Sequence, residues 1–354
     1  MDVGVKEQWR STGNRHSHAG ALSCSGLAPR RTMDFLFVMD PVESMLPDKD
    51  TTFAFMRGAR ARGHRCWCCL PHQIFTVSRE VASEATEVRV SDVVPHTIKG
   101  VTRELRLSDV DVVFIRKDPP FDAQYLHLTQ LLDLASKSTF IVNSPQGLRD
   151  ANEKLFALRF AEYTPRTLVT SSPTRIQEFL REVGGVGVLK PLDGAGGFGV
   201  LLLRHDDPNL HALIDLETLE GKRPALLQEY LPSVRAGDKR VLVLDGKVLG
   251  AIRRVPRGND IRANIHVGGT VEPADLNEAE QDLVNAVGRV LCSHGLWFAG
   301  LDLIGERLIE VNVTSPTGIQ QLAKHLGRPV EQDVIAWAEA KSSRSATEES
   351  NRVR

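Results

Sequence analysis

Short apolar runs alternate with amphipathic segments from residue 33 to about residue 144 of this 354-residue chain. A continuous apolar run is typical of a strand that is covered on both faces of a parallel sheet. We therefore predict an α/β domain over residues 33–150. The Asp-Pro pairs after its strands are either strand-ending turns or part of a ligand site at the carboxyl edge of the sheet. The predicted strands are 34–41, 65–70, 109–122 and 139–143, and the predicted helices are 50–63 and 126–134.

The alternation continues after residue 144 with more hairpins. A helix is predicted over 144–163, because Ser144 can cap its first turn and Pro145 suits the first helical position. Asp245-Gly246 predicts a two-residue hairpin turn. The other predicted helices are 173–183, 277–293 and two closing helices, and the other predicted strands are 166–170, 185–192, 199–204, 224–232, the hairpin 239–255, 298–305 and 307–314.

The two ends of the chain lack this periodicity. Residues 1–32 are rich in Ser, Gly and Ala, which predicts a disordered leader or an upstream start codon. Residues 343–354 are polar and predict a frayed tail.

Composition excludes several classes of protein. Lys plus Arg (44) almost balances Asp plus Glu (45), so no overall field would attract nucleic acid. No apolar run approaches the roughly 20 residues of a membrane span. Three of the five cysteines cluster at Cys66, Cys68 and Cys69 without a second pair of ligands for zinc. We interpret the cluster as a buried strand in a reducing compartment, which predicts a cytoplasmic protein.

The stretch LKPLDGAGGFGV, residues 189–200, contains the pattern G-x-G-x-x-G. A dinucleotide-binding fingerprint requires a helix after these glycines, whereas a short apolar strand follows here. No Gly-Lys-Ser/Thr follows either, which excludes a P-loop, and the catalytic motifs of protein kinases are missing downstream. Strand, glycines and strand together predict a flap whose bare backbone N–H groups contact phosphate oxygens.

The segment GLDLIGERLIEVNVTSP, residues 300–316, carries polar side chains in apolar strands. Alternation puts Glu310 and Asn312 on one strand face, with Ile309, Val311 and Val313 on the other. If the connecting loop has an odd number of residues, such as 305–307, Asp302 lies opposite Glu310. Two carboxylates and an amide suit Mg²⁺, although a solvated hairpin face is the plainer alternative.

These motifs resemble, in order, those of prokaryotic-type glutathione synthetases of the ATP-grasp superfamily. The resemblance covers residues 33–340 and implies an α/β fold, in which a Rossmann-like parallel domain precedes a two-lobed ATP-grasp fold. It implies a lid subdomain at 151–231 and a metal-binding subdomain at 232–342. It also implies a ligase that joins γ-glutamylcysteine and glycine with ATP and Mg²⁺ (or Mn²⁺), acting as a homodimer or homotetramer. The motifs are VMDP, RKDPPFD, NSPQGLRDANEKLF, TPRTLVT, LKPLDGAGG, DDPNL, GDKRVLVLDG and GLDLIGERLIEVNVTSPTGI.

The resemblance assigns a role to each matching position. Arg240 would lie near the transferred phosphoryl group, and Arg262 would act in catalysis and in substrate binding. The implied metal ligands are Asp302, Glu310 and Asn312. The implied ATP-binding residues are Lys154, Lys190, Gly194, Gly196, Gly197, Gly199, Gln228, Glu229, Tyr230 and Leu231. The implied substrate-binding residues are Asp40, Asp118, Arg254, Arg262, Asn264 and Ser315.

The chain departs from this family pattern in the segment 257–270, which resembles a second lid. Ala263 stands where relatives have glycine, and Thr270 stands where they have arginine. The loss of a cation near an anionic substrate leaves open a ligase for another γ-glutamyl dipeptide or another amine. A non-catalytic ATP-binding protein of the same fold is a second alternative, which the retained lysines, Arg240 and metal ligands argue against.

Overall fold

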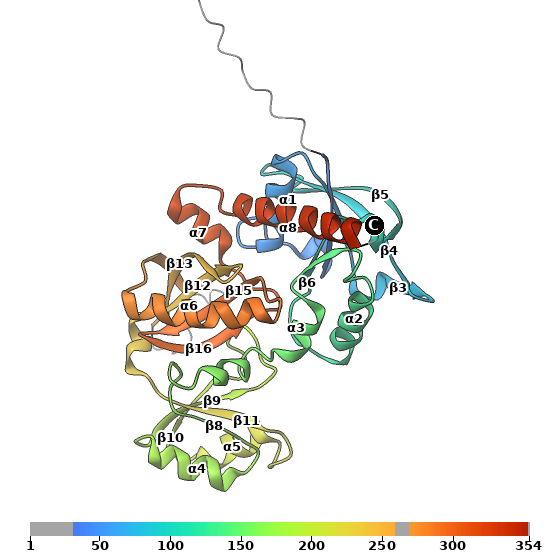
Figure 1. Cartoon of the computed structure of the whole chain (residues 1–354). Coiled ribbons are helices and arrows are strands. Elements are labelled where there is room, and N and C mark those ends of the chain that lie inside the picture. The colour runs from blue at the N-terminus through green and yellow to red at the C-terminus, as the bar shows by residue number, and fades with distance from the viewer. Residues whose placement is uncertain (1–30, 259–268, 353–354) are drawn as a thin grey trace, which may run out of the picture. The chain divides into compact units, whose positions relative to one another are not determined.

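The computed structural model describes residues 31–258 and 269–352 (Figure 1). Residues 1–30, which hold almost all of the predicted leader, lie outside the described residues, as do Arg262, Ala263 and Asn264. In the described part, the strands form three sheets of seven, four and five strands.

The N-terminal sheet has a parallel core of β2, β1, β6 and β7, as the apolar runs predict. Side chains alternate along β1, so that Phe35 and Phe37 join one hydrophobic core while Leu36 and Val38 join another. Helices α1 and α8 pack on the first face, and α2 packs on the second. The bounds are β1 Asp34–Met39, α1 Thr51–Ala61, β2 Arg65–Cys69, β6 Val112–Arg116, α2 Ala123–Asp133, β7 Phe140–Val142 and α8 Glu331–Arg352.

Three antiparallel strands extend this sheet, and the sequence reading did not predict them. They are β3 Ile74–Val77, β4 Glu80–Val90 and β5 Thr97–Arg106. Almost every residue of β5 is exposed, so the strand carries no apolar run that would reveal it. The predicted parallel core is therefore confirmed, and the complete sheet is mixed because these strands pair antiparallel.

The helix predicted over residues 144–163 is interrupted. Ser144 caps its start as predicted, but α3 covers only Pro145–Asp150. The side chain of Asn152 then accepts hydrogen bonds from the backbone N–H groups of Lys154 and Leu155, which starts a new turn instead of continuing the helix. A 3₁₀ segment, Phe156–Phe160, follows. After the break, Glu153 and Lys154 each line one of the two cavities described below.

The four-stranded sheet contains the predicted flap. Its strands are β8 Thr167–Thr170, β9 Val186–Pro191, β10 Leu201–Arg204 and β11 Ala225–Glu229, and β9 and β10 pair as an antiparallel hairpin around the glycine loop. Helices α4 Pro173–Glu182 and α5 Leu210–Thr218 contribute to its hydrophobic core (Figure 1).

The five-stranded sheet carries the polar hairpin. Its strands are β12 Asp238–Leu244, β13 Lys247–Val255, β14 Thr270–Ala274, β15 Phe298–Ile304 and β16 Arg307–Asn312, with helices α6 Glu278–Ser293 and α7 Ile319–Leu326. Leu244 pairs with Lys247, so Asp245-Gly246 forms the predicted two-residue turn, with both residues at positive φ.

The cysteine cluster lies in a buried strand, as predicted. Cys66, Cys68 and Cys69 are buried thiols without a disulfide among the described residues. Burial raises the pKa of Cys66 and Cys69 to about 12, which keeps these thiols protonated.

The tail does not fray where predicted, because α8 continues to Arg352. Among the described residues, no helix is both long enough and apolar enough to cross a membrane.

Candidate functional site

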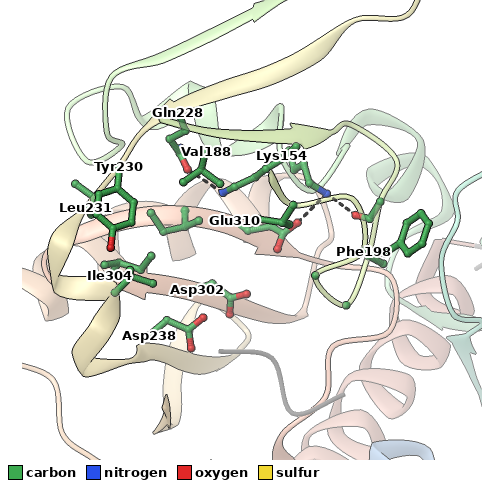
Figure 2. A pocket seen from close by; sticks show the side chains of 18 of the residues that line it. Lys154, Val188, Phe198, Gln228, Tyr230, Leu231, Asp238, Asp302, Ile304 and Glu310 are labelled. Carbon is green, nitrogen blue, oxygen red and sulfur yellow. Dashed lines mark hydrogen bonds and ion pairs between the residues drawn. The ribbon is translucent and has the colours of Figure 1, made fainter. Parts of the chain in front are cut away.

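Two cavities that share residues Ala195 and Gly196 lie along the glycine loop. The first cavity lies between the four-stranded and five-stranded sheets. Side chains from β9, β11, β15 and β16 line it (Figure 2). The predicted ATP-binding residues that line it are Lys154, Lys190, Gly194, Gly196, Gly197, Gln228, Glu229, Tyr230 and Leu231. Of the predicted set, only Gly199 does not line it.

Lys154 crosses the first cavity. Its Nζ donates to the Gly194 carbonyl at 2.5 Å and lies 3.1 Å from Oε1 of Glu310, so one ammonium ties the glycine loop to β16 (Figure 2). The side chain is buried. A buried cation with one nearby carboxylate and a backbone carbonyl can accept a phosphate oxygen in place of the carbonyl.

Lys190 lies on β9 and points into the same cavity. Its Nζ donates to Oε1 of Gln228 at 2.9 Å, and the Gln228 amide donates to Thr167 at 3.2 Å. Burial, opposed by the carboxylate of Glu310 and assisted by the nearby Lys154, lowers the pKa of Lys190 to about 8. An ammonium that burial destabilises gains more from an incoming phosphate than an exposed one does.

This lowered pKa predicts how ATP use depends on pH. The kcat/KM for ATP should fall as pH rises through about 8, because the free protein then loses the Lys190 charge, which an ordinary lysine keeps up to about 10.5. In Lys190→Arg the fall should disappear, since a guanidinium stays protonated over this range. Initial rates at subsaturating ATP from pH 6.5 to 9.5 would measure both profiles. An unchanged fall in Lys190→Arg would assign the titration to another group.

The glycine loop adopts backbone conformations that other residues rarely reach. Gly196, Gly197 and Gly199 have φ values of +63°, +85° and +72°. At Gly194 a Cβ atom would lie 2.5 Å from a side-chain atom of Pro191. The loop is therefore built for close backbone approach to a ligand. At its tip the side chain of Phe198 is exposed (Figure 2).

Asp302 lies opposite Glu310, as predicted, but for a different reason. The turn holds two residues, since Ile304 pairs with Arg307, and so the predicted odd-numbered loop is wrong. A bulge after Asp302 shifts the register by one residue and restores the Asp302–Glu310 pair. Ile309 is the extra residue of the bulge, and it lines the cavity beside Glu310 instead of facing the core with Val311 and Val313.

Asp302 is the centre of a buried ion-pair network. Arg240 approaches it with two nitrogens, Nε at 2.5 Å from Oδ1 and Nη2 at 2.9 Å from Oδ2, and Nη2 of Arg254 lies 3.0 Å from Oδ2. Arg254 also pairs with Asp238 at 2.8 and 2.6 Å. Burial alone would raise the pKa of Asp302, but the two guanidiniums lower it well below its usual range. The carboxylate is therefore ionised at every physiological pH.

The second cavity, about 540 Å³ in volume, lies in the range of about 300–1,000 Å³ that is typical of small-molecule sites. It is lined by the predicted substrate residues Asp40, Asp118, Arg254 and Ser315, together with Arg240 and Asn312. Asp40 accepts a hydrogen bond from the backbone N–H of Asp118 at 2.9 Å and pairs with Lys117 at 3.1 Å. The cavity also reaches the carboxyl ends of β1 and β6, the edge that the sheet rule predicts.

Comparison with known proteins decides the family. The model of the prokaryotic glutathione synthetase N-terminal domain matches residues 33–149, and that of the prokaryotic glutathione synthetase ATP-grasp domain matches residues 153–327. The chain belongs to the prokaryotic glutathione synthetase family.

Curated relatives and solved structures agree with this family. The chain is 39% identical over 316 residues to the glutathione synthetase of Thermosynechococcus vestitus, and the alignment covers 86% of this chain and 99% of the relative. It is 38% identical over 309 residues to the glutathione synthetase of Agrobacterium fabrum, and this alignment covers 87% of this chain and 96% of the relative. By structure it is similar to D-cycloserine synthetase DcsG, with a TM-score of 0.60 at 15% identity over 88% of this chain and 99% of that one. It is also similar to the ATP-grasp ligase PsnB complexed with Mg and ADP, with a TM-score of 0.56 at 19% identity, covering 87% and 98%.

The fold is therefore α/β with an ATP-grasp portion, and the family uses ATP with a divalent cation. The residues implied as metal ligands fit a hard cation. In the described part of the chain, Oε2 of Glu310 and Oδ1 of Asn312 accept no side-chain hydrogen bond, while Asn312 donates to Asp302 at 3.2 Å. Two unengaged oxygens beside an ionised carboxylate are the ligand chemistry that Mg²⁺ prefers.

Sequence reasoning missed several residues of these cavities. Glu153 accepts three hydrogen bonds from Val313 and Thr314 at 2.9–3.1 Å, which fixes the end of β16. Asp238 holds Arg254, and Arg116 and Gln321 line the second cavity. Asp238, Glu153 and Arg116 all lie inside motifs that carry the family resemblance, but only three-dimensional packing brings them to the site. Arg262 and Asn264 lie outside the described residues.

Proposed function

We propose that this chain catalyses the ATP-dependent joining of γ-glutamylcysteine and glycine, forming glutathione, ADP and phosphate. The observation that carries the proposal is the contact between the two cavities through the Arg240–Asp302 pair. The lysines, the glycine loop and Asp302 line the first cavity, and Arg240 with the predicted substrate residues lines the second. Arg240 contacts Asp302 at 2.5 and 2.9 Å, and the cavities share Ala195 and Gly196. Such an arrangement suits the transfer of a phosphoryl group from a nucleotide to a carboxylate.

The first step activates the dipeptide. A carboxylate is anionic and resonance-stabilised, so an amine does not displace its oxygen directly. One oxygen of the cysteinyl carboxylate attacks the γ-phosphorus of ATP, the bond to the β-phosphate oxygen breaks, and an acyl phosphate and ADP form. Lys154, Lys190 and Arg240 would offset the charge on the transferring phosphoryl oxygens.

The second step forms the amide. The glycine amine attacks the acyl carbon, a tetrahedral intermediate forms, and it collapses with release of phosphate and loss of the amine proton. No nucleophilic side chain is required. Water must be excluded while the acyl phosphate exists, and the glycine loop over the first cavity is one candidate cover. The family resemblance implies a second lid in segment 257–270.

The cation in this proposal is Mg²⁺. Asp302, Glu310 and Asn312 would hold it, and it would supply charge neutralisation at the phosphate oxygens. The solved structure of PsnB complexed with Mg and ADP supports this choice by analogy of fold alone. Cytoplasmic location and a homodimer or homotetramer stay predictions.

One observation favours a second candidate of the same class. Thr270 pairs with Val255 at the base of segment 257–270, where the family resemblance implies an arginine. A ligase for a different γ-glutamyl dipeptide would tolerate this change if its substrate lacks the matching anionic group. The two candidates therefore share one reaction and differ only in the acyl substrate.

The proposal is tested by product analysis. The purified full chain is incubated with ATP, Mg²⁺, a panel of γ-glutamyl dipeptides and a panel of amines, and products are identified by mass. We expect glutathione as the main product, with one ADP formed for each glutathione. A different amide as the best product would support the second candidate, and ATP binding without ADP formation in every combination would favour a non-catalytic protein.

Restoring the arginine at position 270 tests the departure from the family. Thr270→Arg should lower the KM for γ-glutamylcysteine by about tenfold, because a charge pair worth about 1.4 kcal/mol corresponds to that factor. The KM for ATP should change little, since Thr270 does not line the first cavity. Steady-state kinetics with each substrate varied would measure both constants. Reduced activity with the best dipeptide would instead show a pocket shaped around threonine.

A further inference from the structure

The strand that carries two of the implied metal ligands lies at the edge of its sheet. Glu310 and Asn312 belong to β16, the last strand in the order β14-β13-β12-β15-β16, so in the described part of the chain only one of its edges pairs with a strand. The backbone N–H and C=O groups on the other edge need different partners. Those partners determine how firmly the two ligands are held.

The residue Glu153 supplies several of these partners. Its carbonyl oxygen accepts from the N–H of Val311 at 2.9 Å, and its Oε1 accepts from the N–H of Val313, also at 2.9 Å. Asn312 is the residue between these two N–H groups. Oε1 also accepts from the N–H and the hydroxyl of Thr314, at 3.1 and 2.9 Å. Glu153 therefore holds the backbone on both sides of Asn312, through its main chain on one side and its side chain on the other.

A second side chain fixes the same point of the backbone. Asn143, which directly follows β7, donates through Nδ2 to the carbonyl of Val313 at 2.8 Å and to that of Phe298 at 2.8 Å. Its Oδ1 accepts from the N–H of Phe298, the first residue of β15, at 2.8 Å. Both polar backbone groups of Val313 are thus engaged by side chains from outside the five-stranded sheet.

The two ligands extend from this fixed backbone. Asn312 donates through Nδ2 to Oδ2 of Asp302 at 3.2 Å, which directs its amide toward the cation site. Glu310 lies 3.1 Å from the ammonium of Lys154, the residue that follows Glu153 (Figure 2). Two neighbouring residues therefore contact the ligand strand, one through its backbone and the other through a ligand side chain. A misplacement of about 1 Å is enough to impair such a site.

We propose that Glu153 is a positioning residue for the cation site: it fixes the backbone on both sides of Asn312 and so the direction in which the ligands of β16 point. The inference rests on the proposed function, in which these ligands and Asp302 hold Mg²⁺. Glu153 acts through an acceptor oxygen, because the single atom Oε1 accepts all three of its side-chain hydrogen bonds with the loop after β16. Its negative charge is not required for this role.

Nucleotide binding with and without the cation tests the proposal without relying on turnover. Calorimetry would measure the affinity of the full chain for a non-hydrolysable ATP analogue, once with excess Mg²⁺ and once with EDTA. The unmutated chain should bind more tightly with Mg²⁺, and the ratio of the two affinities reports the cation site. Glu153→Met, which keeps the side-chain length without an oxygen acceptor, should lose on the order of tenfold or more of this preference. Affinity in EDTA should change little, since Glu153 does not line the first cavity.

Three further variants separate positioning from charge and from folding. Glu153→Gln should keep most of the preference, because an amide oxygen can accept the same three hydrogen bonds. Thr314→Val removes one of the three, so it should lose part of the preference, and it decides the question if Glu153→Met does not fold. Asn277 caps α6 and lines neither cavity, so Asn277→Ala should lower the thermal midpoint and keep the full preference.

Several results would overturn the proposal. A full preference for Mg²⁺ in a folded Glu153→Met chain would show that these contacts do not affect the cation. An equal loss in Glu153→Gln would assign the effect to the carboxylate charge, and equal weakening with Mg²⁺ and with EDTA would assign it to nucleotide binding. An unmutated chain without the preference would have no cation site to position. The expected pattern together with no glutathione in the product assay would overturn the proposed function and leave the role of Glu153 standing.

Discussion

Glu310→Ala is expected to reduce kcat by on the order of 1,000-fold while the protein stays folded. The carboxylate lies opposite Asp302 in the β15–β16 hairpin and 3.1 Å from Lys154, so its removal takes away a cation ligand and the anchor of a phosphate-binding lysine. A lost metal contact is worth several kcal/mol in the transition state, which corresponds to this factor. Glu310→Gln should be almost as severe, because it keeps the shape but loses the charge.

The control for this prediction lies on the same hairpin. Glu306 is exposed in the turn and lines neither cavity, so Glu306→Gln should keep near-normal kcat. Steady-state rates at saturating ATP and dipeptide, with the thermal midpoint of each variant, would make the comparison. Near-normal activity in Glu310→Ala would show that this strand face does not bind the cation.

Arg240→Met is expected to lower kcat by on the order of 1,000-fold with a much smaller change in ATP affinity. A guanidinium that stabilises the charge of a transferring phosphoryl group acts mainly in the transition state, so kcat falls more than binding. The chain should still fold, since Asp302 keeps Arg254 as a partner at 3.0 Å after Arg240 is removed. Arg240→Lys should recover little, because an ammonium cannot make the two-nitrogen contact with Asp302.

Arg253 provides the matched control for Arg240. It lies on the neighbouring strand β13, is only half-buried and lines neither cavity, so Arg253→Gln should keep normal kcat. ATP affinity would be measured by calorimetry alongside the rates. If Arg240→Met raised the ATP dissociation constant as much as it lowered kcat, the arginine would act in ground-state binding instead of phosphoryl transfer.

The elements that depend on local pattern could be predicted from the sequence. The parallel strands, the capped start at Ser144, the Asp245-Gly246 turn and the β9–β10 flap all follow from apolar runs and turn residues. Strand β5 could not be predicted, because it is exposed along almost its whole length. The interruption at Asn152 was missed because it depends on a side chain that competes with the helix for backbone N–H groups.

The site shows the same division. The glycine loop and the pair Asp302–Glu310 could be inferred from spacing, although the pair forms through a bulge and a two-residue turn that the sequence pattern does not reveal. Arg116 stands in the motif RKDPP, but its contact with the Pro316 carbonyl joins residues 200 positions apart. Such long-range packing determines which partners a buried cation has. The partners of Arg116 could therefore be identified only from the structure.

In the proposed reaction, a carboxylate of the dipeptide is activated as an acyl phosphate and then joined to an amine. The most direct measurement uses γ-glutamylcysteine with ¹⁸O in the cysteinyl carboxylate, together with glycine, ATP, Mg²⁺ and the full chain. One carboxylate oxygen bonds to phosphorus in the first step and leaves with it in the second. We expect one ¹⁸O in the released phosphate for each glutathione formed. Glutathione accompanied by unlabelled phosphate, or labelled substrate left unconsumed while ATP binds, would contradict it.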